Sequence, residues 1–252
     1  MAMENLWHGS DRPHKKLLPG GDGGIHVGTH AQADMRNPAF LHRVSALIDP
    51  CRLTRSRDTG GHWASKVRRA RLRGADAIVY LNRWEGVPVN RTETDLDALS
   101  DKAFRSAVPE AEDSLIILDE SSVIVRDILP GVGRLTLYHG TTRENAEALL
   151  SQGFDPSGWR RGANCGRTGM LYLTDDPMNA QWFGEQFGDG VVLEFRPRAC
   201  DLVVDPEDGV EETVVKELMS ALPAFLATRK PISPHHIKLH APDPTTGLDL
   251  SL

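Results

Sequence analysis

Two short motifs place a histidine between an aromatic residue and a glycine. They read Trp7-His8-Gly9-Ser10 and Tyr138-His139-Gly140-Thr141. A histidine on a rigid strand can hydrogen-bond a ligand and orient it with little entropy lost on binding. Because the motif occurs twice, we expect both imidazoles to serve function rather than packing alone.

Each motif is followed, beyond a loop, by a strand that begins after a glycine. Gly169 leads into Met170–Thr174, and Gly24 leads into Ile25–Thr29, in which His26 lies near the place that Tyr172 has in the second half. An aromatic ring at this position could hold a flat ligand by stacking. The recurrence at about 130 residues indicates an internal repeat, which we interpret as two similar halves derived by duplication.

Hydrophobic periodicity places these motifs on regular elements. In the second half it predicts strands over 135–139, 169–174, 191–195 and 231–238, and helices over 178–187 and 208–222, with a short helix ended by Gly153. In the first half it predicts strands over 44–53, 75–82 and 112–118, and helices over 63–73 and 94–107. Pro130, Gly131 and Gly133 mark a linker over 128–133. We therefore expect an N-terminal domain, 1–129, and a C-terminal domain, 134–252.

The order of these motifs resembles the ADP-ribosyltransferase family, in its His-Tyr-Glu branch of diphtheria-toxin-like and PARP-like proteins. The first half, with Gly74-Ala-Asp-Ala-Ile-Val-Tyr-Leu-Asn82, then Glu85-Gly86, then Asp113-Ser-Leu-Ile-Ile-Leu118, also resembles ADP-ribosyltransferase-like proteins of phages and prophages. The resemblance implies an α+β fold of two tandem domains, each a split mixed β-sheet with flanking helices.

The resemblance also assigns roles to residues. In the family the histidine hydrogen-bonds the adenosine ribose of NAD, the adjacent glycine lets the dinucleotide approach the backbone, and the tyrosine stacks on the nicotinamide. It implies NAD-binding positions in both halves: His139, Gly140, Thr141, Tyr172 and Thr174 in the second, and His8, Gly9, Ser10 and His26 in the first.

Catalysis in this family also needs a carboxylate, which favours the positive charge that develops on the ribose. In the first half the acid before the last core strand is Glu112 or Asp113. In the second half the nearest acids are Glu211 and Glu212, of which Glu212 is the candidate. The resemblance thus implies mono-ADP-ribosylation of a protein or nucleic-acid target with NAD as co-substrate, of a phage or toxin type, with His8, His139 and Tyr172 as further catalytic candidates.

Two alternatives remain open. The fold could serve as a non-catalytic binding module, since neither half shows a complete His-Tyr-Glu set. His26 and the basic residues of 63–73 are also compatible with RNA 2′-phosphotransferases, which consume NAD.

Composition sets outer limits on the function. The net charge of −6 argues against general binding of phosphate backbones. No apolar run is long enough to span a bilayer, and no basic segment followed by an apolar one stands at the start, so we expect a cytoplasmic protein without a membrane partner. Three widely spaced cysteines predict reduced thiols and no metal site.

Overall fold

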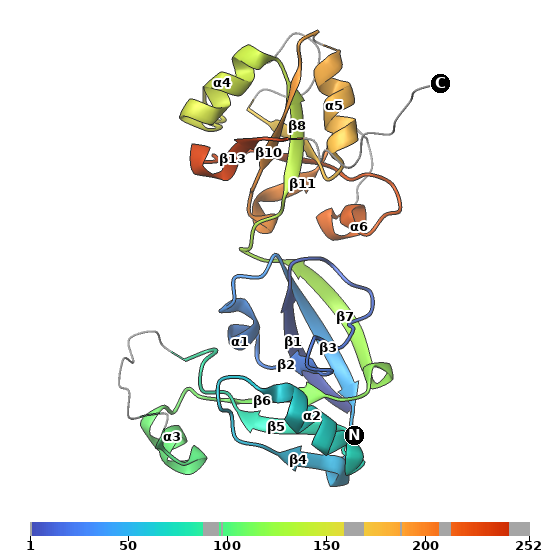
Figure 1. Cartoon of the computed structure of the whole chain (residues 1–252), viewed down its shortest axis with the longest axis vertical. Helices are drawn as coiled ribbons and strands as arrows, with labels where there is room; N and C mark the ends of the chain where they lie inside the picture. The colour runs from blue at the N-terminus through green and yellow to red at the C-terminus, as the bar shows by residue number, and fades with distance from the viewer. Residues whose placement is uncertain are drawn as a thin grey trace. The chain divides into compact units, whose positions relative to one another are not determined.

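The computed structural model describes residues 2–87, 96, 98–158, 169–186, 188–206 and 213–241. The chain divides into two compact units, residues 1–133 (unit 1) and residues 134–252 (unit 2). Both units combine helices with β-sheet, so the fold class is α+β (Figure 1).

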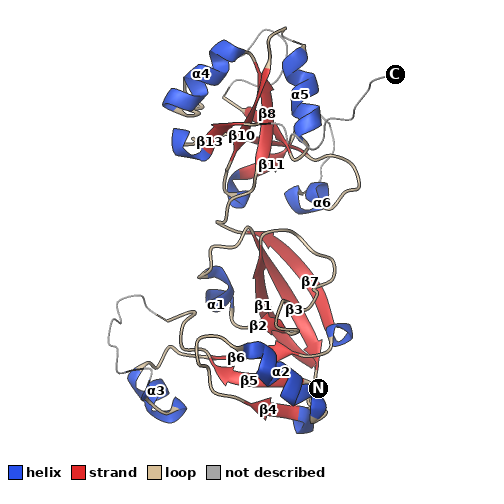
Figure 2. Ribbon diagram, in the orientation of Figure 1, coloured by secondary structure: helices blue, strands red, loops and turns tan. Residues whose placement is uncertain are grey.

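Unit 1 contains two sheets. One has the order β1-β3-β7, made of Ala2–Ser10, Phe40–Leu47 and Val123–Pro130. The other has the order β2-β6-β5-β4, made of Ile25–Val27, Asp113–Ile117, Ala77–Leu81 and Leu53–Arg55. The two sets of strands run at a steep angle to each other (Figure 2). A buried cluster joins them, with Ile25, Val27, Leu115 and Ile117 from one sheet and Val44 and Ala46 from the other.

Three α-helices of unit 1 are described: α1 (His30–Asp34), α2 (Trp63–Leu72) and α3 (Asp101–Ala107). The helix predicted over 94–107 begins only at Asp101, because the Ser100 hydroxyl caps it by accepting from the Ala103 amide at 3.2 Å; residues 88–95 and 97 lie outside the described part. The strand predicted over 44–53 is interrupted at Asp49-Pro50, where a short 3₁₀ turn, Pro50–Arg52, separates β3 from β4.

The described residues of unit 2 form one sheet of six strands in the order β11-β12-β9-β8-β10-β13. These strands are Leu202–Val204, Phe225–Thr228, Leu171–Thr174, Leu137–Thr141, Val191–Phe195 and Ile237–Leu239. The sheet is nearly split in its middle, where β8 and β9 share the single pair Tyr138–Thr174. Helices α4 (Arg143–Gln152) and α5 (Pro177–Glu185) lie on either side of β8 (Figure 1).

A mixed sheet was predicted in each half, but among the described strands only unit 1 has one. A parallel pair, β4 with β5, occurs in unit 1, where α2 provides the crossover that parallel strands require. Every described pair of unit 2 is antiparallel. The helix predicted over 208–222 is also shorter: α6 covers Val214–Leu218 and ends before Pro223, while residues 207–212 lie outside the described part.

The strand order of unit 2 recurs in unit 1. Strands β1, β3 and β7 pair as β8, β10 and β13 do, and strands β2, β6 and β5 pair as β9, β12 and β11 do. An isolated bridge between Trp7 and Gly28 joins β1 to β2, as the single pair joins β8 to β9. Each unit therefore places its histidine motif on the strand next to the split.

Candidate active site

His139 is held by one ring nitrogen. Its Nδ1 lies 2.8 Å from the carbonyl oxygen of Tyr172 on the neighbouring strand, and its ring meets Phe195 edge-on at 6.0 Å. Since a carbonyl only accepts, Nδ1 carries the proton and Nε2 keeps its lone pair. Burial lowers the pKa of His139 below the usual 6.5, which keeps the ring neutral at pH 7. No partner of Nε2 is found within the described residues.

His8 is held in the same way in unit 1. Its Nδ1 lies 2.7 Å from the carbonyl oxygen of His26, the residue that takes the place of Tyr172. Burial is again the main cause that lowers the pKa of His8. The structure thus brings together His8 with His26, and His139 with Tyr172, through the same contact in both units.

The glycines of the two motifs have a packing role that the sequence did not indicate. A Cβ on Gly140 would overlap the carbonyl oxygen of Ala180 in α5 and lie 2.6 Å from the Gly184 nitrogen. A Cβ on Gly9 would lie 2.9 Å from the carbonyl oxygen of Ala33 in α1. In each unit the helix after the second strand therefore occupies the face of the glycine, while the histidine points to the opposite face.

The hydroxyl groups predicted to bind NAD make local contacts. Thr174 accepts from the Asp176 amide at 3.2 Å, and Thr141 accepts from the Asn145 side-chain amide at 3.4 Å. Ser10 donates to the carbonyl of Arg12 and accepts from its amide. These three side chains shape turns and helix starts beside the histidines. Glu212 lies outside the described residues.

His26 has a polar and aromatic environment. Its Nε2 lies 2.6 Å from a carboxylate oxygen of Asp22, and its ring faces Trp63 and Tyr80 at 6.1 and 6.4 Å between centroids. Asp22 belongs to the glycine-rich turn at 20–24 and accepts from the Gly24 amide at 3.0 Å. The glycine-rich turn therefore fixes the imidazole of His26 in place through Asp22.

The two acidic candidates of unit 1 differ in their surroundings. Asp113 is bound by Arg55 at 2.6 Å and by Arg105 at 2.9 Å. Glu112 is exposed, and its carbonyl oxygen accepts from the Gln32 side chain and the Asn82 amide. Sheet register equates Glu112 and Asp113 with Pro223 and Ala224 of unit 2, because Ile116 lies opposite His26 and Ala227 lies opposite Tyr172. An acid at this strand entrance is thus specific to unit 1.

A buried hydrogen-bonded network lies on the same face of the sheet as His26. The Ser114 hydroxyl donates to the Gln32 side chain at 2.9 Å and accepts from the Asn82 side chain at 3.0 Å. The same Asn82 amide group donates to Glu85 at 2.9 Å. No motif in the sequence connects these residues, although the spacing of Tyr80 and Asn82 by two positions indicates a shared face.

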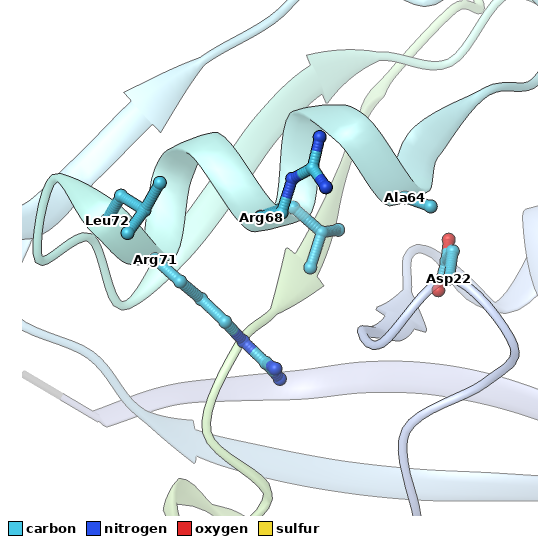
Figure 3. Close-up of a pocket in the computed structure, with 6 residues that line it drawn as sticks. Asp22, Ala64, Arg68, Arg71 and Leu72 are labelled. Atoms are coloured by element: carbon cyan, nitrogen blue, oxygen red, sulfur yellow. The ribbon is translucent and has the colours of Figure 1, made fainter.

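A surface pocket of about 310 Å³ lies between the glycine-rich turn and α2 (Figure 3). It is lined by Asp22 from the glycine-rich turn and by Ala64, Val67, Arg68, Arg71 and Leu72 from α2. Arg71 donates to the carbonyl oxygens of Gly23 and Leu118 at 2.6 and 2.8 Å, so it holds the turn against β6. Asp22 links this pocket to the His26 imidazole.

Another imidazole, that of His42, is fully buried beside His8. Its Nε2 accepts from the His14 amide at 3.0 Å, and burial lowers its pKa to about 4. An unfolded histidine titrates near 6.5, so the unfolded chain binds more protons between about pH 6.5 and 4, and stability falls as the pH is lowered through this range. The loss attributable to His42 is expected to approach about 3 kcal/mol.

Chemical denaturation at pH 7 and pH 4.5 measures this effect. His42→Gln, which keeps an acceptor for the His14 amide but does not titrate, is expected to lose less stability on acidification than the wild-type chain. An equal loss in both proteins would contradict the role given to His42.

No protein-family model matches the chain, and no curated protein is significantly similar to it. Within the described residues, no group of three or more His, Cys, Asp or Glu side chains could hold a metal ion. Across the same residues, no helix has the length and apolarity needed to span a membrane.

Proposed function

We propose that the chain uses NAD as co-substrate and transfers ADP-ribose to a macromolecular acceptor, a protein or a nucleic acid, as phage and toxin modifiers do. In this proposal each unit is an ADP-ribosyltransferase-like domain. His8 and His139 each offer Nε2 to a ribose hydroxyl of the adenosine, and unit 1 is the catalytic half.

The contact shared by the two histidines is the observation that carries this proposal. In both units Nδ1 binds the carbonyl of the second strand, at 2.7 and 2.8 Å, on the same strand order. A neutral ring anchored at Nδ1 presents Nε2 as an acceptor in a fixed direction, which suits a hydroxyl donor.

The assignment of catalysis to unit 1 is supported by charge. Cleavage of the bond between ribose and nicotinamide develops positive charge on the ribose, which a nearby carboxylate stabilises. Unit 1 has acids at and near the entrance of β6, whereas the equivalent positions of unit 2 are Pro223 and Ala224, and Ala224 is fully buried. We therefore propose that unit 2 binds the nucleotide without turnover. This is the role of the non-catalytic binding module considered from the sequence.

Two measurements on the purified full-length chain test the proposal. Calorimetric titration with NAD is expected to show binding, and incubation with NAD is expected to release nicotinamide. A preparation that folds, as judged by a cooperative thermal transition, but neither binds NAD nor releases nicotinamide would exclude the proposed function.

A further inference from the structure

We propose that Glu85, from the loop after β5, supplies the carboxylate of the unit 1 site in place of an acid on β6. This inference rests on the proposed function. In the reaction, the bond between ribose C1′ and the nicotinamide nitrogen breaks, and its electron pair leaves with nicotinamide. The nucleophilic atom of the acceptor, or of water, bonds to C1′ and gives up its proton to solvent. The Glu85 carboxylate stabilises the charge that develops on the ribose.

The acid on β6 faces the wrong way for this task. Side chains alternate along a strand, and Ile116 lies directly opposite His26. Ser114 therefore shares the face of His26, and Asp113 points to the other face, where Arg55 and Arg105 bind it. The polar residue of β6 on the face of His26 is thus a serine, which carries no charge.

Glu85 is held near Ser114 by the side chain of Asn82. The Asn82 side chain lies between Ser114 and Glu85, donating to the Ser114 hydroxyl at 3.0 Å and to a Glu85 carboxylate oxygen at 2.9 Å. The Asn82 side-chain oxygen also accepts from the Glu85 amide at 2.9 Å. Because Asn82 is buried and fixes both the backbone and the carboxylate, Glu85 is positioned rather than freely solvated.

The charges of Glu85 and of its partner Arg36 act on residues of the His8 and His26 environment. Tyr80 lies opposite Ser114 in the sheet, and its ring is 6.4 Å from that of His26. Burial first, and then the charge of Glu85, raises the pKa of the Tyr80 hydroxyl. The Arg36 guanidinium binds Glu85, and its charge contributes to lowering the pKa of His8. Glu85 is thus within electrostatic range of the residues that surround His8 and His26.

The pair of Glu85 with Arg36 is partly solvated rather than closed in the core. The Arg36 side chain is 68% exposed and the Glu85 side chain is 22% exposed.

The test compares Glu85→Gln with matched variants in the full-length chain. Gln keeps the shape of the side chain but removes its charge, so nicotinamide release is expected to fall roughly 100-fold, while NAD binding by calorimetry changes less than about threefold. Glu120→Gln makes the same change on an exposed acid that pairs with Lys16 and is expected to keep the wild-type rate. Glu85→Asp, which retains the charge on a shorter side chain, is expected to release more nicotinamide than Glu85→Gln and guards against loss of folding.

The outcomes separate this inference from the proposed function. Wild-type turnover in Glu85→Gln, or a loss of turnover in Glu112→Gln instead, would overturn the role of Glu85 and leave the proposed function standing. A wild-type chain without NAD binding or nicotinamide release would overturn both.

Discussion

Replacing His8 with asparagine is expected to lower nicotinamide release roughly 100-fold, since a group that orients the substrate is lost from the catalytic half. Asparagine is the most selective replacement. Its side-chain NH₂ can reproduce the Nδ1 donor that binds the His26 carbonyl, while nothing replaces Nε2. The fold is therefore retained and the proposed ribose contact is removed.

Two matched variants show whether the effect belongs to unit 1. His139→Asn is expected to keep most of the turnover and to remove one NAD-binding event from the calorimetric titration. His235→Ala, at an exposed position of unit 2, is expected to change neither quantity. The assignment of catalysis would be wrong if His139→Asn abolished turnover and His8→Asn preserved it.

Replacing Gly140 with alanine is expected to have the largest effect on stability, about 3 kcal/mol or more for unit 2. The added methyl group would overlap the Ala180 carbonyl and crowd the Gly184 amide nitrogen, and both belong to the backbone of α5. Because a backbone cannot rotate away as a side chain can, the helix must shift from β8 and give up its packing.

Urea denaturation measures this effect. Gly158→Ala is the matched control in the same unit, since a Cβ there meets nothing within 4 Å. Gly9→Ala is expected to cost less than Gly140→Ala, because its nearest contacts, at 2.9 Å, include the flexible ring of Pro38. Equal stabilities of Gly140→Ala and Gly158→Ala would contradict the packing role of Gly140.

Local pattern and capping chemistry account for the elements that the sequence predicted well. Hydrophobic periodicity identified β8, β9 and β10. It also predicted α5 to within one residue of its start, which Asp176 caps by accepting from the Met178 amide at 2.9 Å. The predictions were wrong where a local signal competes with a longer pattern. Asp49-Pro50 interrupts a strand, and Ser100 starts a helix later than its apolar pattern predicts.

Contacts that depend on the pairing of strands distant in the sequence could not be predicted from the sequence. The histidine motifs are visible as residues, but the contact from Nδ1 to the second strand depends on which strands become neighbours. Glu85 becomes a candidate only once Asn82 and Ser114, from different strands, are seen in one network. Asp113 stands at the predicted strand entrance, yet its direction and its two arginine partners follow from the sheet register.

A structure of the chain with bound NAD would show whether the two imidazoles hold the nucleotide. We expect a ribose hydroxyl of the adenosine within hydrogen-bonding distance of Nε2 of His8, and a second NAD held in the same manner at His139. NAD bound only elsewhere, such as in the pocket beside α2, with both imidazoles uncontacted, would contradict it.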